Sequence, residues 1–376
     1  MEEYNQTQIN QYLGNPPLLD PQRKLAFLIH PRDLSDIRNN YPSCNNISDD
    51  KLREMTYHTD PRFLGWMDMN SKPYGAFVVS FFIPQDLTFD RRYIKTFRDR
   101  IKKTAIYARD QGIEYLSLAA LSAAFSRYAE DLQDIDGIKS TTGHVITPWT
   151  LEKATERITK KYGLKNPNVS VIGAAGSTGI LLSRRLNRAG YPLTLIDLPD
   201  KQNTLEIFSE KYGNAICTSD INKLNKSDIV LTVTNAPNQL IDIDKINSGI
   251  ILIDDAQPWA WDHEKAYKRF SQKKDILPLE GGLLTFNDGR FRKYDINTTN
   301  TLESDLYCCL GEGIILAHAN GVVPPIVGRN SLDNLEERLE ISDLYGDYAD
   351  NLGLTLATYQ CGTNVYTNAE LDSFSL

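Results

Sequence analysis

The chain has 376 residues, a formal net charge of -8 at pH 7, 41% hydrophobic residues and 24% charged residues. This length predicts at least two domains, and the composition is that of a globular protein rather than a disordered or fibrous one. The acidic charge argues against a general nucleic-acid binder, which needs a basic surface, and no apolar run reaches the roughly 18 residues of a membrane span.

The amino-terminal segment, residues 1–23, is polar and has little periodicity, so we expect a loosely held leader. It lacks the basic start and apolar stretch of a signal peptide. The five cysteines are too irregularly spaced for a disulfide framework, which indicates a reducing compartment. These features together predict a cytoplasmic protein.

Residues 24–147 are predicted to form an N-terminal α/β domain that contributes to substrate binding. Short apolar runs bounded by breakers indicate strands, and a segment with helical spacing ends at Gly112, a favourable helix terminus. The predicted strands are 24–30, 75–83 and 115–118, the predicted helices are 90–111 and 119–132, and the polar stretch between the first two strands is expected to be loop.

Residues 148–282 are predicted to form a Rossmann-type, doubly wound parallel sheet. Thr147-Pro148 is a favourable helix start, and short apolar runs then alternate with helix-length segments, as in a parallel sheet covered on both faces. The predicted strands are 169–172, 193–196, 215–217, 229–234, 250–253 and 276–279, with a helix at 177–189.

Residues 283–376 are predicted to be a hairpin and a helical region that pack on both domains. The turn Asn287-Asp288-Gly289 separates two strand-like runs, which is a strong hairpin signal. Two helices are expected at 302–319 and 333–351. The predicted fold class is therefore α/β, with a Rossmann sheet between a smaller α/β domain and a helical C-terminal region.

A glycine-rich turn, Gly173-Ala-Ala-Gly176-Ser-Thr-Gly179, joins the first predicted Rossmann strand to its helix. Such a turn lets the backbone approach a pyrophosphate, and the free N–H groups and helix dipole favour its negative charge. Gly173, Gly176, Ser177, Thr178 and Gly179 are the predicted cofactor contacts. The alternative is that these glycines only permit tight packing of strand and helix.

Asp197 closes the second strand, 18 residues after Gly179, where a carboxylate can accept hydrogen bonds from the adenosine ribose. It would repel a 2′-phosphate, so the sequence favours NAD, although Lys201 leaves NADP open. The alternative is that Asp197 only caps the turn that follows the strand. Thr234 and Asn235 end the fourth strand, at the edge where ligands of open α/β sheets bind. A turn chosen only for its geometry is equally compatible with these two residues.

Several segments in consistent order, over roughly residues 85–350, resemble the long-chain acyl-acyl-carrier-protein reductases that make fatty aldehydes. They include Ser140-Thr-Thr-Gly143, the glycine-rich turn, Leu252-Ile-Asp254, Glu280-Gly-Gly282, Tyr307-Cys-Cys-Leu-Gly-Glu312 and Gly328-Arg-Asn330. The resemblance implies NADPH-dependent reduction of a thioester, delivered by acyl carrier protein or coenzyme A, through a cysteine acyl-enzyme. It places the nucleophile on Cys309.

Thiolates exchange readily with thioesters, which suits Cys309 chemically, although a cysteine in an apolar helix is usually a small buried hydrophobe. Glu312 lies one helical turn further and is placed to relay a proton or to serve as a structural carboxylate. His144 stands where the family pattern expects Asn, in a loop before a helix. It is a candidate hydrogen-bond donor to a substrate carbonyl, or simply a polar loop residue.

The basic helix, from Arg91 to Lys103, carries seven Lys and Arg residues in an otherwise acidic protein. Such a face is suited to dock an acidic carrier protein, whereas the ordinary explanation is a solvated helix surface. The histidines show no ligand spacing with cysteines or carboxylates, so no metal site is predicted.

Two other functions fit the same sequence. One is a shikimate-dehydrogenase-like or amino-acid-dehydrogenase-like oxidoreductase acting on a small polar acid, because such enzymes also place a catalytic α/β domain before a Rossmann domain. The other is a non-catalytic dinucleotide sensor. Insensitivity to thiol alkylation would favour the first, and cofactor binding without turnover would favour the second.

Overall fold

A computed structural model describes residues 6–13, 24–31, 33–69, 72–83, 93–213, 215–236, 239–287, 291–294, 302 and 304–376. The chain forms two compact units. Unit 1 comprises residues 1–143, 286–299 and 309–328, and unit 2 comprises residues 144–285, 300–308 and 329–376. The chain therefore enters unit 2 at His144, and the predicted C-terminal region, 283–376, is shared between the two units.

Unit 1 is built on a six-stranded mixed sheet in the order β13-β2-β3-β1-β4-β5. Neighbours from β3 to β5 pair in parallel, whereas β2 runs antiparallel to β3 and β13 antiparallel to β2. Its strands are β1 (Leu25–Ile29), β2 (Arg62–Met69), β3 (Lys72–Val79), β4 (Tyr115–Leu118), β5 (Lys139–Thr141) and β13 (Phe291–Tyr294).

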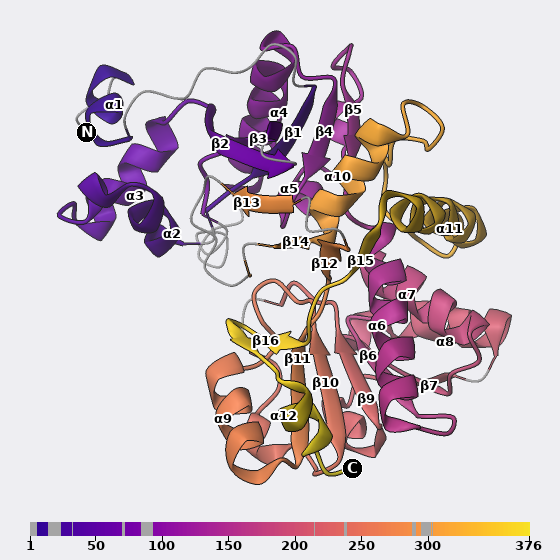
Figure 1. Ribbon diagram of the computed structural model, residues 1–376. Helices are drawn as coiled ribbons and strands as arrows, with labels where there is room; N and C mark the ends of the chain where they lie inside the picture. Colours follow the sequence, from indigo (N-terminus) through magenta and orange to yellow (C-terminus); the bar gives the residue numbers. More distant parts are fainter. Residues whose placement is uncertain are drawn as a thin grey trace. The chain divides into compact units, whose positions relative to one another are not determined.

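Helix α4 (Tyr93–Asp110) packs on β1 and β3 and places Phe97 and Ile101 in the core of unit 1 (Figure 1). It ends at Asp110, and the chain turns away at Gly112, where a φ of +90° suits glycine. The helix predicted over 119–132 is wrong, because three consecutive left-handed residues, Arg127, Tyr128 and Ala129, interrupt it. Only α5 (Ser122–Phe125) and a 3₁₀ turn, Glu130–Leu132, form there.

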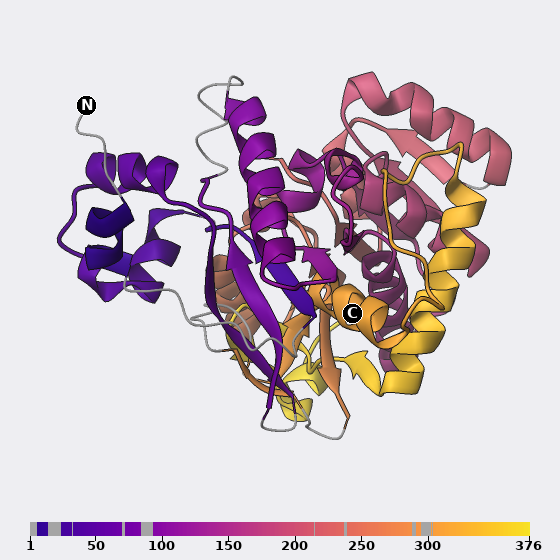
Figure 2. The same ribbon diagram turned by 90° about the horizontal axis from the view of Figure 1, so that it is seen from above.

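The stretch between the first two predicted strands, which was predicted to be loop, instead forms two helices and a strand. It contains α2 (Leu34–Asn40), α3 (Asp49–His58) and β2. Figure 2 shows α2 and α3 grouped with α1 (Gln6–Leu13), whose Ile9 is fully buried in a small apolar cluster with Leu52 and Met55. The amino-terminal segment predicted as a leader thus contributes a helix to this cluster.

Unit 2 contains a six-stranded sheet in the order β11-β10-β9-β6-β7-β8, with every neighbouring pair parallel (Figure 1). When the strands of this sheet are numbered one to six in chain order, their spatial order from β8 is 3-2-1-4-5-6. This is the Rossmann arrangement of two mononucleotide-binding halves. The strands are β6 (Val169–Ile172), β7 (Leu193–Ile196), β8 (Ala215–Thr218), β9 (Ile229–Thr232), β10 (Ile250–Asp254) and β11 (Ile276–Glu280). The predicted Rossmann fold is confirmed.

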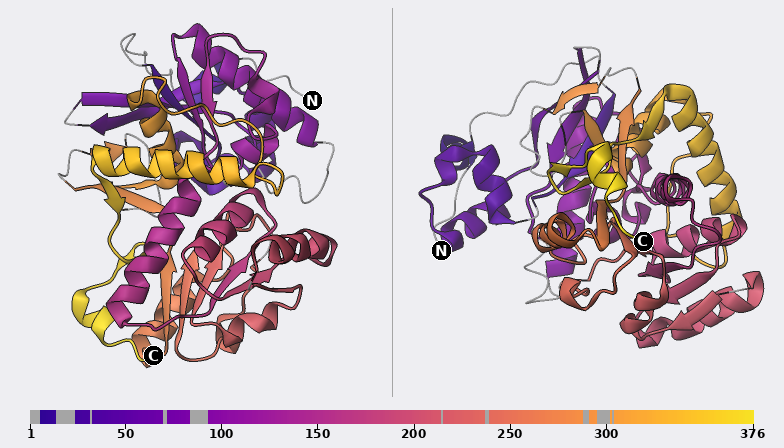
Figure 3. Two further views of the ribbon diagram at one scale, coloured as in Figure 1. Left: turned by 90° about the vertical axis from the view of Figure 1, so that its right-hand side faces the viewer. Right: turned by 60° about the horizontal axis from the view of Figure 1, so that its bottom comes forward.

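The helices of unit 2 include α6 (Ile146–Tyr162), α7 (Ser177–Arg188), α8 (Gln202–Tyr212) and α9 (His263–Lys273). The carboxy-terminal α11 (Leu335–Leu352) packs on both α6 and α7, as Figure 3 shows. Gly346 allows this close approach, because a Cβ there would lie 2.2 Å from Nε1 of Trp149. A last helix, α12 (Asn368–Asp372), begins with a capping box formed by Thr367 and Glu370.

The predicted hairpin over residues 283–294 does not form. Strand β12 (Leu283–Phe286) pairs with β14 (Asp305–Tyr307) and β15 (Leu354–Leu356), whereas β13 pairs with β2 in the sheet of unit 1. Partners distant in sequence therefore override the local turn signal, part of which lies outside the described residues. A two-stranded sheet of β16 (Gln360–Cys361) and β17 (Asn364–Val365) follows, and α10 (Cys308–His318) begins directly after β14.

Candidate functional site

The glycine-rich turn lies between β6 and α7, at the carboxyl end of the central strand of unit 2. Gly173 has a φ of +85°, and a Cβ there would lie 3.0 Å from the Val233 carbonyl oxygen. A Cβ on Gly179 would lie 2.0 Å from the Gly173 carbonyl oxygen. A side chain at either glycine would therefore meet neighbouring backbone, so the strand, the turn and the helix pack closely at this point. Close packing of this kind occurs in dinucleotide-binding turns, and it is equally what the packing alternative requires.

Asp197 follows β7 directly and faces the same turn. Its Oδ2 accepts a hydrogen bond of 2.7 Å from the Ala175 N–H, and its Oδ1 accepts one of 2.8 Å from the Leu198 N–H. The side chain is partly exposed. Its carboxylate is thus fixed beside the turn, on the half of the sheet where the adenosine of a dinucleotide would lie.

Two residues that the sequence did not assign to the site, Arg329 and Asn330, lie against the turn. Nη2 of Arg329 donates to the Ala175 carbonyl oxygen at 3.3 Å. Asn330 is fully buried; its N–H donates to Oγ of Ser177 at 3.0 Å, and its Nδ2 donates to the Ser177 carbonyl oxygen at 2.9 Å. Ser177, a predicted cofactor contact, is thereby held in place by Asn330, and an exposed guanidinium stands at the turn.

The remaining predicted contacts occupy different positions. Thr178 is partly exposed in the first turn of α7. Thr234 and Asn235 follow β9, the fourth strand, and thus lie over the other half of the sheet. The carbonyl oxygen of Thr234 accepts a hydrogen bond of 3.1 Å from the Gln257 N–H. Asn235 is exposed and accessible to a ligand.

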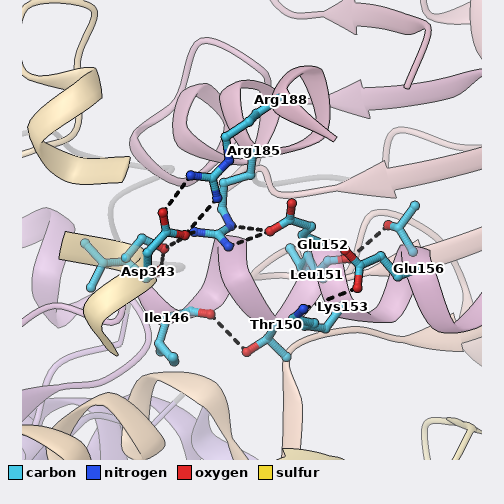
Figure 4. A network of polar contacts seen from close by, with 12 residues as sticks. Ile146, Thr150, Leu151, Glu152, Lys153, Glu156, Arg185, Arg188 and Asp343 are labelled. Carbon is cyan, nitrogen blue, oxygen red and sulfur yellow. Dashed lines mark hydrogen bonds and ion pairs between the residues drawn. The ribbon is translucent and has the colours of Figure 1, made fainter. Parts of the chain in front are cut away.

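A buried ionic network fixes the helices behind the turn (Figure 4). Arg185 of α7 donates to Oε2 of Glu152 in α6 at 2.6 Å and to Oδ1 of Asp343 in α11 at 2.9 Å. Arg188, one turn further along α7, also pairs with Asp343, at 2.6 Å. Arg185 and Glu152 are almost fully buried, so this network ties α6, α7 and α11 together and sets the direction of the helix that would face a pyrophosphate.

A second buried network lies at the carboxyl ends of β10 and β11. His263 Nε2 lies 2.9 Å from Oδ2 of Asp254, and its Nδ1 lies 3.2 Å from Oε2 of Glu280. Burial alone lowers the pKa of His263, but the two carboxylates outweigh it and raise the pKa to about 9. The imidazole is therefore a buried cation at neutral pH, held between two acidic groups.

Cys309 and Glu312, the predicted catalytic pair, lie together in unit 1 on α10. Cys309 is partly exposed in the first turn of that helix, and a Cβ on Gly143 would lie 2.6 Å from the Cys309 Cβ. Glu312 is fully buried: its Oε1 accepts the Thr141 hydroxyl, the Thr142 N–H at 3.1 Å and the Gly143 N–H at 2.7 Å. This geometry favours a carboxylate that positions the 141–143 segment beside Cys309 over a proton relay.

His144 is the first residue of unit 2, and its carbonyl oxygen accepts Nδ2 of Asn330 at 2.8 Å. The basic helix coincides with α4, but Arg91 and Arg92 lie outside the described residues. Within the described part of this helix several cations are neutralised by carboxylates: Arg98 pairs with Asp131, Lys102 with Asp134 and Lys103 with Asp60. The carrier-protein dock therefore stays a prediction.

Across the described ranges, no helix combines the length and the apolar character needed to cross a membrane. The same residues contain no cluster of three or more His, Cys, Asp or Glu side chains that could hold a metal ion.

No protein-family model matches this chain, and none of the curated proteins matches it. Among solved structures, it is similar to shikimate dehydrogenase from Aquifex aeolicus, with 12% identity, a TM-score of 0.38 and coverage of 70% of this chain and 88% of that one. It is also similar to L-tryptophan dehydrogenase from Nostoc punctiforme, with 13% identity, a TM-score of 0.36 and coverage of 89% and 88%.

A third similar structure is quinate dehydrogenase from Corynebacterium glutamicum in complex with NAD, with 14% identity, a TM-score of 0.36 and coverage of 68% of this chain and 88% of that one. The Rossmann fold of unit 2 rests on its own strand order. The resemblance to acyl-acyl-carrier-protein reductases finds no counterpart among these structures and stays a prediction.

Proposed function

We propose that this chain is an NAD(P)-dependent oxidoreductase whose cofactor binds at the carboxyl edge of the unit 2 sheet. The observation that carries the proposal is the glycine turn between β6 and α7, where Gly173 and Gly179 lie too close to backbone for a Cβ, together with the Asp197 carboxylate that binds the same turn. When bound, the nicotinamide would supply or accept a hydride. The chain's own groups would hold the pyrophosphate on the first N–H groups of α7 and the adenosine ribose on Asp197.

The choice between NAD and NADP depends on Asp197 and Arg329. Asp197 favours NAD because its charge would repel a 2′-phosphate. The side chains of Asp197 and Arg329 both hydrogen-bond to the backbone of Ala175. The positive charge of Arg329 would therefore offset part of the repulsion between Asp197 and a 2′-phosphate. We expect NADH to bind more tightly than NADPH, and Arg329→Gln to weaken NADPH binding more than NADH binding, measured by quenching of protein fluorescence.

Two substrate classes are compatible with such an enzyme. The first is an acyl thioester reduced to an aldehyde through Cys309, supported by the position of this thiol at the amino end of α10, where the helix dipole favours an anion. In that step the Cys309 sulfur would bond to the acyl carbon, the substrate C–S bond would break and the released thiol would take a proton. The bond to Cys309 would break after the acyl carbon had gained the hydride.

The second substrate class is a small polar acid, of the kind that appears in the names of shikimate dehydrogenase and quinate dehydrogenase. That chemistry needs no thiol. The two classes separate in one experiment: intact-mass measurement of the protein after incubation with a panel of acyl-coenzyme A thioesters, without cofactor. A covalent acyl adduct that Cys309→Ser abolishes and Cys217→Ser retains would support the thioester. Absence of any adduct, with full turnover of a hydroxy or keto acid after thiol alkylation, would support the small acid.

A non-catalytic dinucleotide sensor is the remaining function, and it shares the cofactor site. It would bind NADH or NADPH but turn over neither class of substrate. The partly exposed thiol of Cys309 beside Gly143 argues for an enzyme over a sensor.

A further inference from the structure

The carboxyl end of β10 carries a second acidic residue, Asp255, that the buried network does not use. Its neighbour Asp254 turns its carboxylate to Thr232, Ala260 and His263. Because successive side chains near the end of a strand point to opposite sides, the Asp255 carboxyl faces away from that network. It lies instead against Gly282.

The surroundings of Asp255 come from α6, β11 and the first residue of α10. A Cβ on Gly282 would lie 1.9 Å from Oδ1 of Asp255 and 3.2 Å from Sγ of Cys308, so the carboxyl and this thiol face the same point. The thiol in turn lies 2.8 Å from Oγ1 of Thr147 in α6. Glu280 ends β11, the strand beside β10, and pairs with His263 of α9. Asp255 itself is partly exposed, and no hydrogen bond to its side chain is found among the described residues.

This place lies over the fourth to sixth strands, the half of a Rossmann sheet that receives the nicotinamide, whereas Asp197 marks the adenosine half. Partial burial of the carboxyl, reinforced by the negative charges of Asp254 and Glu280, raises the pKa of Asp255 above its ordinary value. A carboxyl with a raised pKa at this position is suited to exchange a proton with a bound substrate.

Resting on the proposed function, we infer that Asp255 is the acid that protonates the substrate oxygen as the adjacent carbon gains a hydride. The Asp255 O–H bond would break, the two electrons of the carbonyl π bond would move to the substrate oxygen, and the new O–H bond would form there. The carboxylate left on Asp255 would recover a proton from water. In the direction of oxidation the same group would act as the base.

The inference can be tested without knowing the substrate, through the protons that accompany cofactor binding. Oxidised NAD carries a positive nicotinamide ring, whereas NADH does not. A positive ring beside Asp255 would drive the loss of its proton. Isothermal titration at several pH values, in buffers of different ionisation enthalpy, should show more protons released per NAD⁺ bound than per NADH bound. If the protein binds the phosphorylated pair instead, NADP⁺ and NADPH serve as the probes.

The variant Asp255→Asn should bind NADH with an affinity within about twofold of the wild type and release no proton with NAD⁺. Its folding is not expected to suffer, because the amide replaces a desolvated acid of the same shape, and thermal unfolding checks this. Asp347→Asn, in an exposed position of α11 in the same unit, is the matched control and should release protons as the wild type does. Equal proton release in Asp255→Asn and the wild type would overturn the inference. Binding of neither dinucleotide by the wild type would instead refute the proposed function.

Discussion

His263 gives this protein a stability that depends on pH in a direction set by its buried partners. In the unfolded chain its pKa returns to about 6.5, whereas in the folded protein the pKa is about 9. Between these two pH values the folded state holds a proton that the unfolded state has lost, so the free energy of unfolding falls as the pH rises. The contribution is complete below pH 6.5 and is lost by about pH 9; it amounts to roughly 3 kcal/mol.

The raised pKa of Glu280 has the same sign of effect, but that effect begins at lower pH, near its ordinary value of 4.5. Urea unfolding of the wild type at pH 6 and at pH 9.5 measures the difference. His58→Gln, at an exposed position, should leave it unchanged, and His263→Gln should remove most of it. If His263→Gln does not fold, the titration of the His263 ring by NMR gives its pKa directly. A pKa near 6.5 would refute the reasoning.

Three further predictions concern the elements around the two candidate sites. Arg185→Met leaves Glu152 buried without its cation and should lower the free energy of unfolding by about 3–5 kcal/mol. The double variant Arg185→Met with Glu152→Leu should recover much of this loss. An equal loss in the single and the double variant would contradict a stabilising role of the ion pair. Glu312→Gln should cost about 1–3 kcal/mol in urea unfolding, because Thr141 and the two N–H groups lose a carboxylate acceptor, and unchanged stability would argue against a positioning role. Asp197→Asn should narrow the preference for NADH over NADPH by at least about tenfold in the ratio of Kd values, and an unchanged ratio would remove Asp197 from cofactor selection.

The parts of the fold that could be predicted are those whose signal is local. The strands of unit 2 are short buried apolar runs, and the predicted range 169–172 coincides with β6. The failures came where tertiary contacts decide. Residues 119–132 have helix-forming composition, yet the left-handed turn at 127–129 ends the helix early. The turn at 287–289 suggested a hairpin, but β12 and β13 join strands from other parts of the chain.

The candidate cofactor site follows the same division. The glycines and Asp197 are separated by a fixed number of residues within one strand, turn and helix unit, so their spacing reveals them. Arg329 and Asn330 contact residues of the turn that lie 154 and 153 positions earlier in the chain, and no local pattern indicates that contact. Asp255 is equally hidden in the sequence, because its surroundings come from α6, α10 and β11 rather than from its own strand.

The central claim, a dinucleotide site at the glycine turn, is tested most directly by titration of NADH and NADPH into the wild type and Gly179→Ala. A Cβ at this position would lie 2.0 Å from backbone, so Gly179→Ala should weaken binding at least about tenfold. The control is Gly190→Ala, just beyond the same helix, where a Cβ meets no atom within 4 Å. Its strained φ of +89° should cost stability without weakening binding. Tight binding by the wild type and the control, with loss in Gly179→Ala, is the predicted result. Binding by all three proteins with equal affinity, or by none, would contradict the account.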